Sequence, residues 1–248
     1  MFNRPSLRLL VLLPALAALA ACEVAPAPST PPASARVQAA APGALLEPEA
    51  AAQNFIAVVR RMEPQIEAAC NTRARGQNCD YQIVVDDRPG QSPNAFQTVD
   101  AGGRPVIGFN LALISEARNA DELAFVMGHE AAHHIAGHIP RKQQDAMAGA
   151  MILGALAAAS GADTGVIRSA QDIGATVGGR AKAKDYELEA DRLGTVLTWE
   201  AGYDPLRGAQ FFARIPDPGR TVLGSHPANA LRIDIVRQTV ADLRAGRI

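Results

Sequence analysis

The sequence predicts an α+β fold that is mainly helical, with a small β-sheet. Segments whose apolar residues recur at helical spacing fill most of the chain after residue 47, whereas strand-like runs are confined to residues 81–109. Hydrophobic residues make up 48% of the 248-residue chain and aromatic residues only 4%, so the core is expected to be largely aliphatic. The 24 basic and 25 acidic side chains nearly balance, which argues against nucleic acid as a partner.

Residues 1–46 are expected to lie outside the folded domain. Residues 1–21 are typical of a secretory signal, because two Arg precede an apolar run that is too short to span a bilayer. The run ends in Leu-Ala-Ala before Cys22, which resembles a bacterial lipobox and implies a lipidated Cys22; the alternative is an ordinary cleavage site with a chance Cys. Glu23 is not the Asp that often retains such lipoproteins at the inner membrane, so the outer membrane is expected.

A Pro- and Ala-rich segment, residues 22–46, predicts a tether between this anchor and the folded domain, which covers residues 47–248. Pro48 suits the first turn of a helix, and apolar residues follow at helical spacing from Phe55 to Ile66. A strand is predicted over Tyr81–Val85. Phe96–Val99 and Pro105–Phe109 predict a hairpin, because a Gly-containing turn separates them.

The second half of the chain is expected to be helical. Asn119, three residues before Glu122, resembles a capping box and predicts a helix that runs to Pro140. Ala146–Ala159 is an unbroken run of small and apolar residues, too short for a membrane span, which predicts a buried or interfacial helix. Three further helices are expected, over Ala183–Ala201, from Asp204-Pro205, and over Ala228–Arg244.

Two cysteines remain if Cys22 carries lipid. Export to an oxidising compartment favours a disulfide between Cys70 and Cys79, which would close a short loop around Gly76; the alternative is two reduced thiols.

Four of the five histidines lie between residues 129 and 138, and two of them form the pattern His129-Glu130-x-x-His133, a zinc-peptidase signature. Residues i and i+4 share one helix face, so both imidazoles can reach one ion, and Glu130 can reach a water on that ion. A solvated His/Glu face is disfavoured, because the preceding segment, Leu123–Met127, is wholly apolar.

A catalytic zinc needs a third protein ligand. Ile139 stands where a metzincin would have a third His, so the ligand must come from elsewhere. The best candidate is Glu187, because Asp191 lies on the same helix face and can bond the far nitrogen of a ligand His. Glu189 points elsewhere on that helix and is expected to be a solvated carboxylate.

His134 and His138 are also four residues apart. We expect them to face away from the zinc pair, as structural residues or as partners of the ligands, in preference to a second metal site.

These pieces together resemble the M48 family of metallopeptidases, over residues 50–245. The resemblance implies a gluzincin-like metallopeptidase core with the small sheet beside the HExxH helix, one Zn²⁺ per chain and Glu130 as general base. The implied zinc ligands are His129, His133 and Glu187. The family often has an aliphatic residue where His134 stands, so this chain departs from the pattern there. The matching motifs are Asn94-Ala95-Phe96, Gly128-His129-Glu130-x-x-His133 with His138, Glu187-x-x-x-Asp191-Arg192, and Ser225-His226-Pro227 with Arg232.

The resemblance also places His226 beside the zinc, either as a reversible fourth ligand that blocks the site or as a donor to the oxyanion; a structural loop His is the alternative. Arg232 is a second candidate for the oxyanion, although it also fits an exposed helix face.

The sequence therefore predicts a zinc-dependent endopeptidase, lipid-anchored at the periplasmic face of the bacterial outer membrane, that hydrolyses unfolded or misassembled envelope proteins. An extended substrate is expected to pair with an edge strand at Val106–Phe109. The alternative is a chaperone or assembly factor for outer-membrane proteins whose zinc site is closed by His226. A membrane-embedded protease is disfavoured, because no run outside the signal has the length of a span.

Overall fold

The computed structural model describes residues 44–216 and 227–248. The predictions for the signal, for the lipidated Cys22 and for His226 lie outside these residues. The first described helix, α1 (Pro48–Arg73), begins as expected with a Pro in its first turn. Its buried face repeats every four residues through Val58, Met62 and Ile66 and packs against α3.

The described strands form a sheet in the order β1-β3-β2, from β1 (Gln82–Asp86), β2 (Ala95–Val99) and β3 (Pro105–Asn110). The predicted hairpin is confirmed, because β2 and β3 are antiparallel and Val99 pairs with Pro105. The predicted edge strand is wrong: β3 also pairs in parallel with β1 and is the central strand. Five of the six residues of β3 are buried, as a central strand requires, but the chain-distant parallel partner could not be read from local pattern.

Helix α3 (Ala120–Ile135) follows the short helix α2 (Leu111–Glu116). Its predicted cap is present, because the Glu122 amide donates to Asn119 Oδ1 at 3.1 Å. The predicted end at Pro140 is wrong. The helix stops at Ile135, the next residues turn through Gly137 at φ 66°, and a new helix begins at His138 with Pro140 in its first turn.

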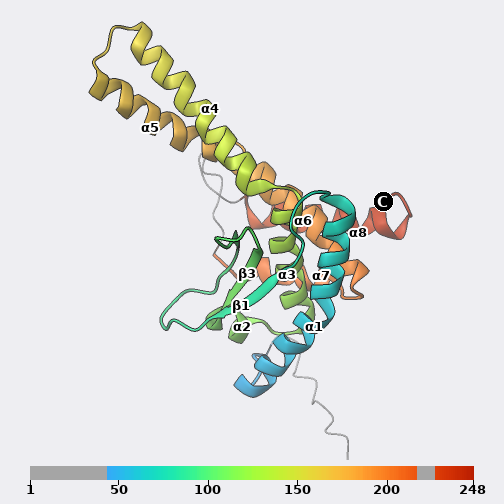
Figure 1. Cartoon of the computed structure of the whole chain (residues 1–248). Coiled ribbons are helices and arrows are strands. Elements are labelled where there is room, and N and C mark those ends of the chain that lie inside the picture. Colours follow the sequence, from blue (N-terminus) through green and yellow to red (C-terminus); the bar gives the residue numbers. More distant parts are fainter. Residues whose placement is uncertain (1–43, 217–226) are drawn as a thin grey trace, which may run out of the picture. The chain divides into compact units, whose positions relative to one another are not determined.

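This new helix, α4 (His138–Ala159), forms a hairpin with α5 (Thr164–Ala181), which the sequence analysis did not predict (Figure 1). Glycines allow the close pairing: a Cβ added to Gly149 would lie 2.1 Å from the Gly174 carbonyl oxygen. The expectation that Ala146–Ala159 is buried is wrong, because its large side chains point outward and Met151 is 71% exposed. An interfacial role for this helix stays a prediction. In the described ranges, no helix has both the length and the apolar character needed to cross a membrane.

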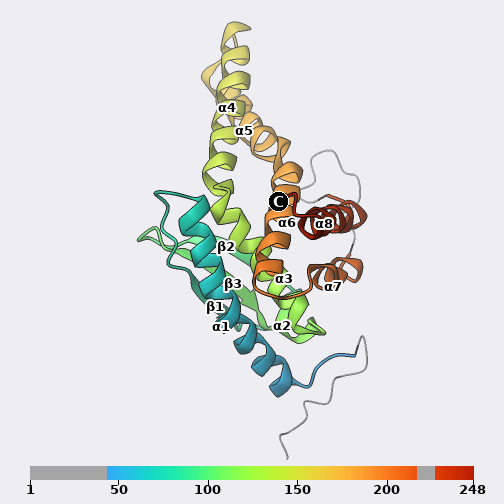
Figure 2. The same cartoon turned by 90° about the vertical axis from the view of Figure 1, so that its right-hand side faces the viewer.

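Helix α6 (Ala183–Glu200) returns along α3, with α8 (Asn229–Arg244) on its other side (Figure 2). Along the chain, α6 and α8 are separated by α7 (Pro205–Gly208) and by a 3-10 helix, Ala209–Ala213. α3 and α6 cross where Gly128 faces Gly194: a Cβ added to Gly194 would lie 2.8 Å from the His129 amide nitrogen. This close crossing brings the HExxH helix next to the helix that carries Glu187.

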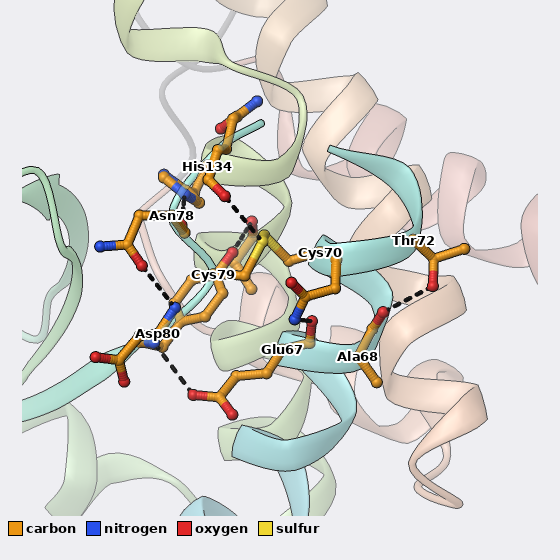
Figure 3. The surroundings of a disulfide bond; sticks show 12 residues. Glu67, Ala68, Cys70, Thr72, Asn78, Cys79, Asp80 and His134 are labelled. Carbon is orange, nitrogen blue, oxygen red and sulfur yellow. Dashed lines mark hydrogen bonds between the residues drawn. A yellow bond between two sulfur atoms is a disulfide. The ribbon is translucent and has the colours of Figure 1, made fainter. Parts of the chain in front are cut away.

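Cys70, near the end of α1, is joined to Cys79 by a disulfide (Figure 3). The predicted disulfide is therefore present, and the alternative of two reduced thiols is wrong. Beside the disulfide, His134 Nε2 lies 2.8 Å from the Asn78 carbonyl oxygen and the His134 ring meets Tyr81 edge-on. His134 therefore faces away from His129 and His133, as expected, and holds the segment that carries the disulfide.

Candidate metal centre and active site

Two adjacent helices bring three potential metal donors together. His129 and His133 lie on successive turns of α3, with their Nε2 atoms 3.1 Å apart. From α6, the Glu187 carboxylate places one oxygen 3.4 Å from His129 Nε2 and the other 3.5 Å from His133 Nε2. All three side chains are buried, and their donor atoms lie within 4.8 Å of one another.

The chemistry of this donor set fits zinc. Two imidazole nitrogens and one carboxylate oxygen are the ligands of a catalytic zinc that keeps a fourth position open. Burial of a carboxylate between two imidazoles is costly unless a cation compensates its charge. His129, His133 and Glu187 can therefore hold one zinc ion.

The outward nitrogen of His129 is held by a buried ion pair. Its Nδ1 lies 2.9 Å from Asp191 Oδ1. Arg232 in α8 donates to both oxygens of Asp191, from Nε at 2.8 Å and from Nη2 at 2.7 Å, and stacks over the Phe212 ring. Arg232 is 5% exposed, so the exposed-face alternative for it is wrong. Asp191 thus contacts the far nitrogen of the ligand His129, as its spacing of four residues from Glu187 predicted.

The two imidazoles have opposite pKa shifts. Burial opposes the cation of His129, but hydrogen bonds to Asp191 and Glu187 outweigh it and raise the pKa of His129 to about 9. Burial and the neighbouring His129 charge lower the pKa of His133 to about 2. Burial also acts against the charge of Asp191, yet the Arg232 charge and the bonds from His129 and Arg232 keep its pKa below the ordinary value.

His133 has a different partner, which corrects two expectations. Its Nδ1 lies 2.7 Å from Nδ1 of His138, so His138 does not face away from the zinc pair. His138 Nε2 in turn lies 3.2 Å from Glu189 Oε2, so Glu189 is not simply a solvated carboxylate. The reason is the break at Gly137: in one continuous helix His138 would lie beyond His134, whereas the turn brings it back over His133.

Glu130 lines two cavities that meet at the donor set. The larger, of about 450 Å³, also contacts Arg232 and Phe212, and the smaller, of about 290 Å³, contacts His138 and Phe96. His129, Glu187, Asn94 and Ala95 line both. The start of β2 therefore lies beside the metal donors. Among the described strands β2 pairs only with β3, so it is an edge strand.

A family model described as "Peptidase family M48" matches residues 56–240, which is most of the chain. The chain belongs to peptidase family M48. Membership implies a metalloprotease, in agreement with the buried His-His-Glu group.

One similar curated protein is named "Putative beta-barrel assembly-enhancing protease", from Vibrio cholerae serotype O1 (strain ATCC 39315 / El Tor Inaba N16961). The two are 30% identical over 149 residues, which is 53% of this chain and 30% of the relative. This chain thus spans less than a third of that relative's length.

The sequence left open a role for His138 as a partner of a zinc ligand, but its orientation toward His133 and its contact with Glu189 were not predicted. Gly137 was the available signal, because a Gly just after a His-rich helix favours a helix end and lets the next residue change direction.

Proposed function

We propose that this M48 chain is a zinc-dependent endopeptidase of the bacterial envelope that hydrolyses unfolded or misassembled envelope proteins. The observation that carries the proposal is the position of Glu130. This carboxylate lies one residue after His129 and lines both cavities that open onto the buried donors. A general base must stand beside both the metal and the substrate space, and Glu130 meets both conditions.

The chemistry follows from the donor set. His129, His133 and Glu187 would hold the zinc, which would supply a Lewis acid that lowers the pKa of a water and polarises a peptide carbonyl. Glu130 takes a proton from the attacking water and delivers it to the departing amine nitrogen as the peptide C–N bond breaks. Arg232 directs two donors at Asp191, so it fixes the orientation of His129 through that carboxylate. A direct contact of Arg232 or His226 with the oxyanion stays a prediction.

The substrate is expected to bind as an extended strand along β2. This strand replaces β3 as the candidate edge, and its first residues line both cavities beside Glu130. Added-strand binding relies on backbone hydrogen bonds and requires an unfolded segment. This mode of binding supports unfolded or misassembled chains as substrates.

The location is proposed from the sequence. The lipobox before Cys22 and the Pro/Ala-rich tether support a lipid anchor at the periplasmic face of the outer membrane. The Vibrio cholerae relative is named a beta-barrel assembly-enhancing protease, and this name supports β-barrel proteins as a target of the proposed activity. Nucleic acid is not an expected partner of the nearly neutral chain.

The test is digestion of casein by the purified chain with one equivalent of zinc. Glu130→Gln should bind zinc like the wild type and lose activity by about 10²–10⁴-fold, the usual contribution of a general base. Glu49→Gln is the matched control, because Glu49 is exposed in the first turn of α1 and lines neither cavity, and it should retain activity. Cleavage by Glu130→Gln at the wild-type rate would refute the proposed mechanism.

The same assay separates the chaperone alternative. If His226 reversibly blocks the site of an active enzyme, His226→Ala should cleave casein faster than the wild type. If the protein is a chaperone with a closed zinc site, the wild type and His226→Ala should both bind zinc and cleave nothing.

A further inference from the structure

We propose that His138 is a positioning residue for the zinc ligand His133, and that Glu189 and Arg141 anchor it at the base of the α4–α5 hairpin. The proposal rests on the zinc site proposed above and concerns how one of its ligands is oriented. Its basis is a series of contacts that runs from the buried ligand His133 through His138 to the partly exposed Glu189 and Arg141.

The hydrogen bonds along this chain define where each proton lies. If His133 uses Nε2 toward the metal, its neutral ring carries the proton on Nδ1 and donates it to His138 Nδ1 at 2.7 Å. His138 then carries its own proton on Nε2 and donates to Glu189 Oε2 at 3.2 Å. The same oxygen accepts from Arg141 Nη1 at 2.8 Å. Each atom in the series has one role, and the series ends on a cation.

The end of the series is an ion pair. Arg141 Nη1 lies 2.8 Å from Glu189 Oε2, and both side chains are less than half exposed. A charged carboxylate can only accept hydrogen bonds, so it orients the His138 Nε2 proton toward itself.

Packing fixes the His138 ring in place. The side chain is 1% exposed, and its ring stacks on Tyr186 with centroids 4.8 Å apart. The Arg141 guanidinium also lies over the Tyr186 ring, 4.4 Å from its centroid. The Tyr186 hydroxyl donates to Asp145 of α4, so Tyr186 in α6 joins the start of the hairpin to the helix that carries Glu187.

The two histidine ligands are therefore supported differently. Nδ1 of His129 lies beside a buried carboxylate, Asp191, whereas Nδ1 of His133 faces His138, which links it to the carboxylate of Glu189. Outer partners of metal-bound histidines fix ring orientation and tautomer, and their loss reduces metal affinity by about 10–100-fold. The orientation of His133 thus depends on how α4 begins.

The test measures zinc affinity by competition with a chelating dye, together with the visible spectrum of the Co²⁺-loaded protein and the thermal stability of the metal-free protein. His138→Phe keeps the ring and its stacking on Tyr186 but removes both nitrogens. It should bind zinc about 10–100-fold more weakly and alter the Co²⁺ spectrum. His138→Asn, whose amide oxygen can replace Nδ1 as the acceptor, should bind zinc more tightly than His138→Phe.

His134→Phe is the matched control in α3, the helix that carries His133, because His134 contacts the Asn78 carbonyl oxygen and not the metal donors. It should lower thermal stability and leave zinc affinity and the Co²⁺ spectrum unchanged. Glu189→Ala, at a position that is half-exposed and tolerant of truncation, should weaken zinc binding by a smaller factor and decides the question if His138→Phe does not fold.

The proposal is overturned if both His138→Phe and Glu189→Ala bind zinc as tightly as the wild type. If His138→Phe does not fold, wild-type zinc affinity in Glu189→Ala alone overturns it. Either result leaves the proposed peptidase intact. Absence of tight zinc binding by the wild type would overturn both.

Discussion

The crossing of α3 and α6 offers a direct test of how the metal donors are brought together. In Gly194→Ala the new Cβ would lie 2.8 Å from the His129 amide nitrogen and 2.9 Å from its Cα. Carbon atoms pack at about 3.5–4.0 Å, so the helices must separate by roughly 0.5–1 Å. The opposing atoms are backbone, which cannot turn aside as a flexible side chain could.

The cost follows from this overlap. Overpacking of this kind destabilises by about 1–3 kcal/mol, offset by up to about 1 kcal/mol because Ala is the better helix former. Separation of the helices also lengthens the 3.4 and 3.5 Å distances from Glu187 to His129 and His133. Metal–ligand distances tolerate only about 0.2 Å of error, so zinc affinity should fall together with stability.

Urea unfolding of the metal-free protein and dye competition for zinc measure the two effects. Gly179→Ala in α5 is the matched control, because its new Cβ would lie 3.5 Å from the Ala146 Cβ, an ordinary contact. The control should keep or slightly raise stability and leave zinc affinity unchanged. If Gly194→Ala unfolds at the wild-type urea concentration and binds zinc equally well, α3 and α6 do not approach as closely as described.

Three other predictions concern stability. Arg232→Met strands the fully buried Asp191 without its cation and should cost about 3–5 kcal/mol in urea unfolding; a loss below about 1 kcal/mol would contradict a buried pair. Replacement of both Cys70 and Cys79 by Ser releases a loop with a sequence separation of 9 and should cost about 2–3 kcal/mol more under oxidising conditions than in reductant, where only the burial of two hydroxyls remains. Met151→Lys should change stability by less than about 0.5 kcal/mol, because this side chain is 71% exposed; a large loss would show that the outer face of α4 is covered in solution.

Local pattern was sufficient for the elements that carry the donors. The spacing of His129, Glu130 and His133 is a property of one helix turn, and the Glu187/Asp191 pair repeats that spacing on the next buried helix. Caps and turns such as Asn119 and the β2–β3 hairpin were also predictable, because their signals lie within a few residues of the structure they determine.

Contacts between distant segments required the tertiary structure. The parallel pairing of β1 with β3 made β3 central, and no local signal in β3 identifies that partner. The outward face of α4 follows from its glycine-lined pairing with α5, although its composition alone suits a core helix. The burial of Arg232 depends on Asp191, which is 41 residues away in sequence.

By itself, the sequence determined which side chains can hold a metal, because ligand chemistry and helix periodicity are local. Only the tertiary structure decided how these ligands are supported. The turn at Gly137 moves His138 from beyond His134 to a position over His133, and α6 supplies Glu189 to complete the contact. A left-handed residue changes the direction of everything that follows it, and periodicity within one helix cannot anticipate that change.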